Sequence, residues 1–173
     1  MPRSPTSRIP DLLRAAAAVR DRAHAPYSHY PVGAAVLAGG RIFAGCNVEN
    51  SAYPLSVCAE RNAVAVAVAA GEKRIEAVAI VGGNKGRPSA PCGGCRQVIA
   101  EFSTPATPVV YASPEGKTIA TTVGALLPSA FTASDVTGEA GESRRSRPAT
   151  RSRAVSGIDR SAARVRGTRK SGR

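Results

Sequence analysis

Two short motifs hold the side chains with the most chemistry in this sequence. The first is Cys58-Ala59-Glu60, and the second, Pro91-Cys92-Gly93-Gly94-Cys95, begins its cysteine pair 34 residues after Cys58. Three thiolates can bind one zinc ion and leave its fourth position open, as in a catalytic rather than a structural zinc site. Zinc of this kind activates water, and a nearby carboxylate can carry the protons. The spacing predicts zinc ligands at Cys58, Cys92 and Cys95, with Glu60 as the catalytic acid and base.

Both motifs fall where helices are expected to begin, over residues 58–71 and from residue 92 onward. A helix N-terminus carries unpaired N–H groups and partial positive charge, which favour thiolate over thiol. Three thiolates on Zn²⁺ leave a net negative charge, so a cation should draw electron density from the sulfurs. Arg61 is the main candidate for this role, and Arg96 is the weaker one.

Several plainer interpretations compete with this site. Glu60 could simply complement the helix dipole, and Arg61 could be an ordinary surface arginine. Cys46 could close a structural zinc module as a fourth thiolate, which would leave no open position and no activity. The Cys-x-x-Cys pair taken alone would suit a redox motif, and four cysteines could form two disulfides.

Helical and strand patterns alternate along the chain and predict an α/β layer structure. Because two of the strands form an early hairpin around Gly39-Gly40, the sheet should be mixed, with about five strands. The expected helices cover residues 10–24, 58–71, 92–102 and 123–127, and the expected strands cover residues 32–37, 41–46, 75–81, 108–112 and, more weakly, 117–121.

The composition allows one domain with a core of small aliphatic side chains. Hydrophobic residues make up 43% of the chain, but aromatic residues make up only 4% and Trp is absent. No apolar run approaches the roughly 20 residues that span a bilayer, and the first residues have no signal-peptide pattern. We therefore expect a cytoplasmic protein without a membrane partner.

The net charge of +12 is concentrated near the end of the chain. Residues 1–131 carry 13 basic and 8 acidic side chains, whereas the shorter segment 132–173 carries 11 basic and 4 acidic ones. Apolar periodicity also stops near residue 132. We therefore expect a catalytic domain over residues 1–131 and a disordered Arg/Ser-rich tail over 132–173, which is either simply solvated or in contact with nucleic acid.

Five ordered segments, the two motifs among them, make residues 10–131 resemble the small, single-domain cytidine deaminases. Such a series of matches at compatible spacing is far more specific than any one of them. The segments are residues 25–35 (APYSHYPVGAA), 45–50 (GCNVEN), 58–61 (CAER), 91–97 (PCGGCRQ) and 126–131 (LLPSAF).

This resemblance implies a three-layer α/β/α fold, one zinc ion per subunit and a homotetramer. It implies that Asn47 and Glu49 hold the ribose hydroxyls and that Tyr30, where the family usually has Phe, stacks near the base. Backbone groups of Ala59 and of residues 89–91 would read the exocyclic amine. Tyr53 and Phe131, also expected to bind substrate, look like residues that the family contributes across subunit boundaries, although plain core or rim packing would also explain them.

The implied reaction is hydrolytic deamination of cytidine and 2′-deoxycytidine to uridine and 2′-deoxyuridine with release of ammonia, a step of pyrimidine salvage. Two related activities compete with it: deamination of nucleic acid, for which the basic tail could track phosphates, and deamination of an aminonucleoside antibiotic such as blasticidin. The Asn47–Glu49 pair favours a free nucleoside, and with residues 51–53 it favours plain cytidine.

Overall fold

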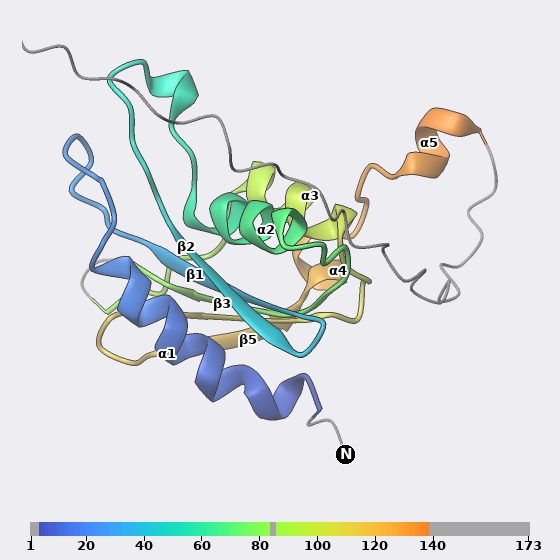
Figure 1. Ribbon diagram of the computed structural model, residues 1–173, viewed down its shortest axis with the longest axis horizontal. Helices are drawn as coiled ribbons and strands as arrows, with labels where there is room; N and C mark the ends of the chain where they lie inside the picture. Colours follow the sequence, from blue (N-terminus) through green and yellow to red (C-terminus); the bar gives the residue numbers. More distant parts are fainter. Residues whose placement is uncertain (1–3, 84–85, 139–173) are drawn as a thin grey trace, which may run out of the picture. The chain divides into compact units, whose positions relative to one another are not determined.

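The computed structural model describes residues 4–83 and 86–138 (Figure 1). Five strands form one sheet: β1 (Gly33–Ala38), β2 (Arg41–Cys46), β3 (Ile75–Val81), β4 (Pro108–Ala112) and β5 (Thr118–Thr122). The α-helices are α1 (Ile9–Arg20), α2 (Ala59–Ala69), α3 (Gly93–Glu101), α4 (Val123–Leu126) and α5 (Ala133–Thr137), with 3-10 turns at η1 (Thr6–Arg8) and η2 (Tyr53–Leu55).

The sheet is mixed, with strand order β2-β1-β3-β4-β5. β1 pairs antiparallel with β2 and β3, β4 pairs antiparallel with β5, and only β3 and β4 are parallel. In the β1–β2 hairpin, Gly39 and Gly40 have φ values of 55° and 73°, which glycine adopts without steric cost. The parallel pair needs a crossover, and α3 supplies it.

Helices cover both faces of this sheet, so the predicted three-layer α/β/α architecture is confirmed. Alternate residues of the fully buried strand β1 serve two separate cores. Ala35 and Leu37 pack with Leu12 and Ala16 of α1, whereas Val36 packs toward α2 and α3 on the other face. Figure 1 shows α1 on one side of the strands and α2 and α3 together on the other.

Two glycines allow helices to approach the sheet closely. A Cβ atom at Gly45 would lie 2.5 Å from the backbone nitrogen of Ala63 in α2, and one at Gly33 would collide with the carbonyl oxygen of Ala16 in α1. Small residues on both sides of these contacts fit a core built from Ala and Val. The close approach sets the distance between β2, which ends directly before Asn47, and α2, which begins directly after Cys58.

Two predicted boundaries differ from the structure by more than two residues. The first helix ends at Arg20 rather than at residue 24, because the backbone of His24 pairs instead with Asn47 and Glu49. Residues 133–137, expected within the disordered tail, form the short helix α5, whose N-terminus is closed by a capping box between Thr132 and Asp135. The rest of that tail, residues 139–173, lies outside the described residues. Across residues 4–83 and 86–138, no helix has both the length and the apolar character needed to cross a membrane.

Candidate active site

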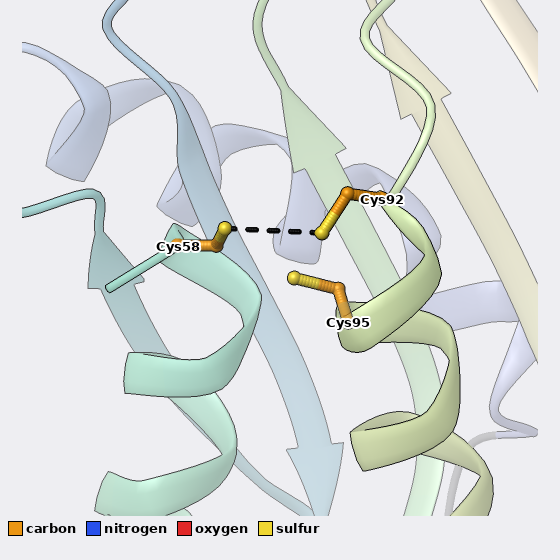
Figure 2. Close-up of side chains that lie close together, drawn as sticks. All are labelled: Cys58, Cys92 and Cys95. Atoms are coloured by element: carbon orange, nitrogen blue, oxygen red, sulfur yellow. Dashed lines mark hydrogen bonds between the residues drawn. The ribbon is translucent and has the colours of Figure 1, made fainter. Parts of the chain in front are cut away.

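The three predicted zinc ligands meet between the starts of α2 and α3 (Figure 2). Cys58 is the N-cap residue of α2, Cys92 is the N-cap residue of α3, and Cys95 lies in the first turn of α3. Figure 2 shows their sulfurs pointing toward one another from the two helices. The Cys58 and Cys92 sulfurs lie 3.9 Å apart, and all three lie within 4.8 Å of one another.

This spacing fits one zinc ion. Sulfurs at about 2.3 Å from a tetrahedral zinc ion stand about 3.8 Å from each other, so only small shifts would bring the three to bonding distance. In the described part of the chain, these cysteines are the only cluster of three or more Cys, His, Asp or Glu side chains placed to share an ion. Cys95 is buried while Cys92 is exposed, so the cluster opens to solvent on one side.

The protonation of the thiols also suits metal binding. The Cys95 thiol donates a hydrogen bond that lowers the pKa of Cys58 to about 6, and the positive charge of Arg61 contributes in the same direction. The same hydrogen bond, together with burial, raises the pKa of Cys95. One sulfur of the cluster is therefore a thiolate at neutral pH, and bound metal would displace the remaining protons.

Glu60 lies in the first turn of α2 and is only 5% exposed, next to the cysteine cluster along the chain. Burial raises the pKa of its carboxyl above the usual 4.5, and a hydrogen bond with Cys95 opposes this to a smaller extent. A raised pKa makes the protonated form of a carboxyl easier to reach, as a group that must both take and release a proton requires. Its burial argues against the interpretation of Glu60 as a surface residue that only complements the helix dipole.

Asn47 and Glu49, which follow β2, both bind the loop that carries Tyr30. The Asn47 side chain accepts a hydrogen bond from the Val32 N–H at 2.8 Å and donates one to the Tyr30 carbonyl at 3.0 Å. Glu49 accepts hydrogen bonds from the Tyr27 N–H at 3.0 Å and the Ser28 N–H at 3.2 Å, and from the Ser28 hydroxyl. The structure thus brings together Asn47, Glu49 and Tyr30, three of the residues predicted to bind substrate.

These hydrogen bonds also set the charge of Glu49. The Ser28 hydroxyl makes the largest contribution to lowering the pKa of this carboxyl, and the two backbone N–H groups add to it. A carboxylate oxygen has two acceptor positions, so three donors leave Glu49 about one position for a further hydroxyl. Glu49 therefore remains charged and able to accept a hydrogen bond in the folded chain.

Tyr53 and Phe131 are surface residues, 70% and 63% exposed, which excludes core packing within this chain. The Tyr53 ring meets Tyr27 edge-to-face at 5.8 Å between ring centroids. The Phe131 carbonyl accepts a hydrogen bond from the Gln97 side chain at 2.6 Å, which ties the end of the domain to α3. Ala59, by contrast, is fully buried in the first turn of α2.

The two candidate arginines differ in their surroundings. Arg61 is exposed and acts on Cys58 through its charge. Arg96 is half-buried and donates hydrogen bonds to the Pro91 carbonyl at 2.8 Å and to the Leu126 carbonyl at 3.0 Å. Arg96 therefore holds the backbone directly before Cys92, whereas the sequence offered it only as the weaker candidate for a cation near the sulfurs.

Cys46 does not join the cluster. Its sulfur donates instead toward the Arg22 carbonyl, at 3.6 Å, and all four cysteines are free thiols. The structural zinc module with a fourth thiolate, and the two disulfides, are therefore not what the structure shows.

Sequence reasoning missed the parts played by Ser28, Asn62 and Gln97. Asn62 donates to the Cys46 carbonyl at 2.8 Å and so joins α2 to the end of β2. The contacts of Asn62 and Gln97 reach 16 and 34 residues along the chain, and that of Ser28 with Glu49 reaches 21. Periodicity records only local neighbours, so it does not predict these contacts, although Ser28 and Gln97 lie in two of the segments that resemble the family.

Comparisons with known proteins agree with this geometry. Residues 6–112 match a family model described as the cytidine and deoxycytidylate deaminase zinc-binding region. A cytidine deaminase of Sporosarcina psychrophila is 46% identical over 129 residues, which cover 74% of this chain and 94% of that protein. The chain belongs to the cytidine deaminase family. A second member, from Halalkalibacterium halodurans, is 43% identical over 126 residues, covering 72% of this chain and 95% of that protein.

Solved structures of cytidine deaminases share the fold. The crystal structure of the enzyme from Burkholderia pseudomallei has a TM-score of 0.66 and 48% identity, and covers 70% of this chain and 97% of its own. The structure from Mycobacterium tuberculosis has a TM-score of 0.60 and 37% identity, covering 70% and 95%. The predicted family, fold class and zinc cofactor are therefore confirmed.

Proposed function

We propose that this chain catalyses the hydrolytic deamination of cytidine and 2′-deoxycytidine to uridine and 2′-deoxyuridine, with release of ammonia. One observation carries the proposal: three cysteine sulfurs at zinc-binding distance meet at two helix starts, beside the buried carboxyl of Glu60. Relatives named cytidine deaminase, similar over nearly their whole length, support it.

The roles of the residues follow from this arrangement. Cys58, Cys92 and Cys95 hold zinc, which when bound supplies the Lewis acidity that makes water a nucleophile at neutral pH. Glu60 takes a proton from that water and delivers it to the ring nitrogen next to C4, which makes C4 electrophilic. After addition at C4, Glu60 moves the proton of the new hydroxyl to the amine, which leaves as ammonia while the C4 carbonyl forms. Arg61 supports the thiolates through its charge.

Binding of the nucleoside is assigned to the loop of residues 27–32 and to Asn47 and Glu49, whose neighbour Val48 pairs with Val57, directly before Cys58. Asn47 and Glu49 bind ribose hydroxyls, Tyr30 lies against the base, and backbone groups of Ala59 and of residues 89–91 read the exocyclic amine. Arg96 already donates to the Pro91 carbonyl, which leaves that oxygen one acceptor position at most. We favour a free nucleoside over nucleic acid because Asn47 and Glu49 suit ribose hydroxyls and because most of the excess positive charge lies in residues 132–173, outside the proposed catalytic domain.

We also propose that the enzyme is a cytoplasmic homotetramer that acts in pyrimidine salvage. The exposed side chains of Tyr53, Leu55 and Phe131 are large and apolar, and such groups are commonly covered by a partner subunit. Sedimentation equilibrium should give four times the mass of the 17.7 kDa chain. A monomer at micromolar concentration would contradict this assembly.

The reaction is tested by following the ultraviolet spectrum of cytidine or 2′-deoxycytidine with purified protein. We expect conversion of both nucleosides, loss of activity with a zinc chelator, and recovery when zinc is added back. The same cytosine within single-stranded RNA or DNA should remain unchanged. Zinc-loaded protein that converts only the polymer, or neither nucleoside, would overturn the proposed function.

A further inference from the structure

One hydroxyl group lies at the centre of the loop assigned to nucleoside binding, residues 27–32. Ser28 donates its hydroxyl hydrogen to a carboxylate oxygen of Glu49 and accepts a hydrogen bond from the Tyr30 N–H at 3.1 Å. It therefore contacts both the carboxylate assigned to the ribose and the backbone of the residue assigned to the base. Ser28 was not among the predicted site residues.

The backbone around Ser28 forms a turn that the Ser28 hydroxyl helps to close. His29, between Ser28 and Tyr30, has a φ of 54°, in the left-handed region that residues other than glycine rarely adopt. Its N–H donates to the Ala25 carbonyl at 3.1 Å, which closes the turn from one side. The Ser28 hydroxyl closes it from the other side, because it accepts from Tyr30 two residues later. The position of Tyr30 thus depends on this turn.

The hydroxyl also orients Glu49. The two backbone N–H groups of Tyr27 and Ser28 both bind the same carboxylate oxygen, Oε2, so they alone leave the carboxylate free to turn about it. The Ser28 hydroxyl binds the other oxygen, Oε1. It therefore fixes the plane of the carboxylate and the direction of its remaining acceptor position.

We propose that Ser28 is a positioning residue for nucleoside binding, whose hydroxyl sets the ribose-binding carboxylate of Glu49 and the ring of Tyr30 in one fixed relation. The inference rests on the proposed function. Ser28 touches neither the reacting atoms nor the cysteine cluster, so its removal should affect binding of the nucleoside and leave the chemical step and the zinc content alone.

The decisive comparison is Ser28→Thr with Ser28→Val, because these side chains have nearly the same shape and only Thr keeps the hydroxyl. We expect Ser28→Val and Ser28→Ala to raise the KM for cytidine about tenfold, as for the loss of a hydrogen bond to a charged group, with kcat within about threefold. Ser28→Thr should stay within about threefold of the wild type in both constants. Ser7→Ala, which removes an exposed serine hydroxyl on η1, should change neither.

A second measurement separates positioning from general loosening of the fold. If Ser28 acts through Glu49, then Ser28→Ala should raise KM far less in a Glu49→Ala background than in the wild type. Zinc content and Tm of each variant should match those of the wild type. Equal KM values for the Thr and Val variants, a loss confined to kcat, or full additivity with Glu49→Ala would each overturn the role of Ser28 in an active enzyme. A wild-type protein that leaves cytidine unchanged would overturn the proposed function, and the role of Ser28 with it.

Discussion

The proton-transfer role proposed for Glu60 depends on its position in the buried first turn of α2. A glutamate in water is ionised at neutral pH and is a poor proton donor. Burial raises the pKa of the Glu60 carboxyl, which makes the protonated, proton-donating form easier to reach. Its neighbour Ala59 is fully buried as well, so the first turn of α2 packs into the domain. The role of Glu60 therefore depends on one helix turn being inside the protein.

Replacing Glu60 with Gln is the direct test at this scale. Gln keeps the size of the side chain but cannot accept and release protons, so kcat should fall by about 10²–10⁴-fold. Zinc content should not change, because Glu60 is not a ligand. The activity is followed by ultraviolet absorbance and the zinc by metal analysis. Glu76→Gln, on β3, is the matched control and should retain activity; an active Glu60→Gln enzyme would exclude the proposed proton carrier.

The start of α3 carries two of the three predicted zinc ligands, Cys92 and Cys95. Arg96 links the Pro91 carbonyl, next to Cys92, to the Leu126 carbonyl at the end of α4. Gln97 makes a similar link to Phe131. The first turns of α3 thus connect a ligand-bearing loop to a segment 30 residues away in sequence.

Removal of Arg96 should therefore weaken zinc binding although Arg96 is not a ligand. Without its two hydrogen bonds the backbone before Cys92 becomes less well held, and we expect Arg96→Ala to lower zinc affinity by about 10–100-fold. Competition with a chromogenic chelator measures this. Arg14→Ala, which removes a largely exposed arginine of α1, should leave the affinity unchanged. An unaltered zinc affinity in Arg96→Ala would show that Cys92 is held in place without the two hydrogen bonds of Arg96.

A second prediction at this scale concerns the packing of α1 on the sheet. In Gly33→Ala the new Cβ would collide with the Ala16 carbonyl oxygen and lie 2.7 Å from the Arg20 nitrogen, so α1 must shift. We expect the free energy of unfolding to fall by about 1–3 kcal/mol, measured by denaturant titration. In Gly94→Ala, on α3, the added Cβ has no neighbour within 4 Å, and stability should rise by up to about 1 kcal/mol. Equal stabilities of the two variants would contradict the close approach of α1.

At the scale of the whole molecule, a larger share of this chain than of its relatives lies outside the match. The match to the Sporosarcina psychrophila enzyme covers 94% of that protein but only 74% of this chain. Residues 132–173 also hold most of the excess positive charge. The division into a catalytic domain of residues 1–131 and a tail stays a prediction.

Truncation after Gly138 tests this division. We expect kcat/KM for cytidine to stay within about twofold of the full chain, because the site residues all lie earlier, and any salt-sensitive mobility shift with RNA to disappear. Gel shifts at two salt concentrations and the ultraviolet assay measure both effects. A large loss of deaminase activity would place part of the active site or of its support in the tail.

Much of this protein could be predicted from the sequence alone. The cysteine spacing, the expected helix starts at residues 58 and 92 and the early hairpin all have local causes: N-cap position, apolar periodicity and a Gly-Gly turn. These signals placed all five strands and predicted the zinc site, because each motif carries its ligands within a few residues.

Tertiary structure alone decided how those pieces act on one another. Three hydrogen bonds join residues 16 to 30 positions apart in the sequence: Asn62 to Cys46, Ser28 to Glu49, and Arg96 to Leu126. The end of α1 at Arg20 and the burial of Glu60 were likewise settled by neighbours that are distant in sequence. Local pattern sets which elements form, but the energy of these contacts arises only when packing brings their partners within hydrogen-bond reach.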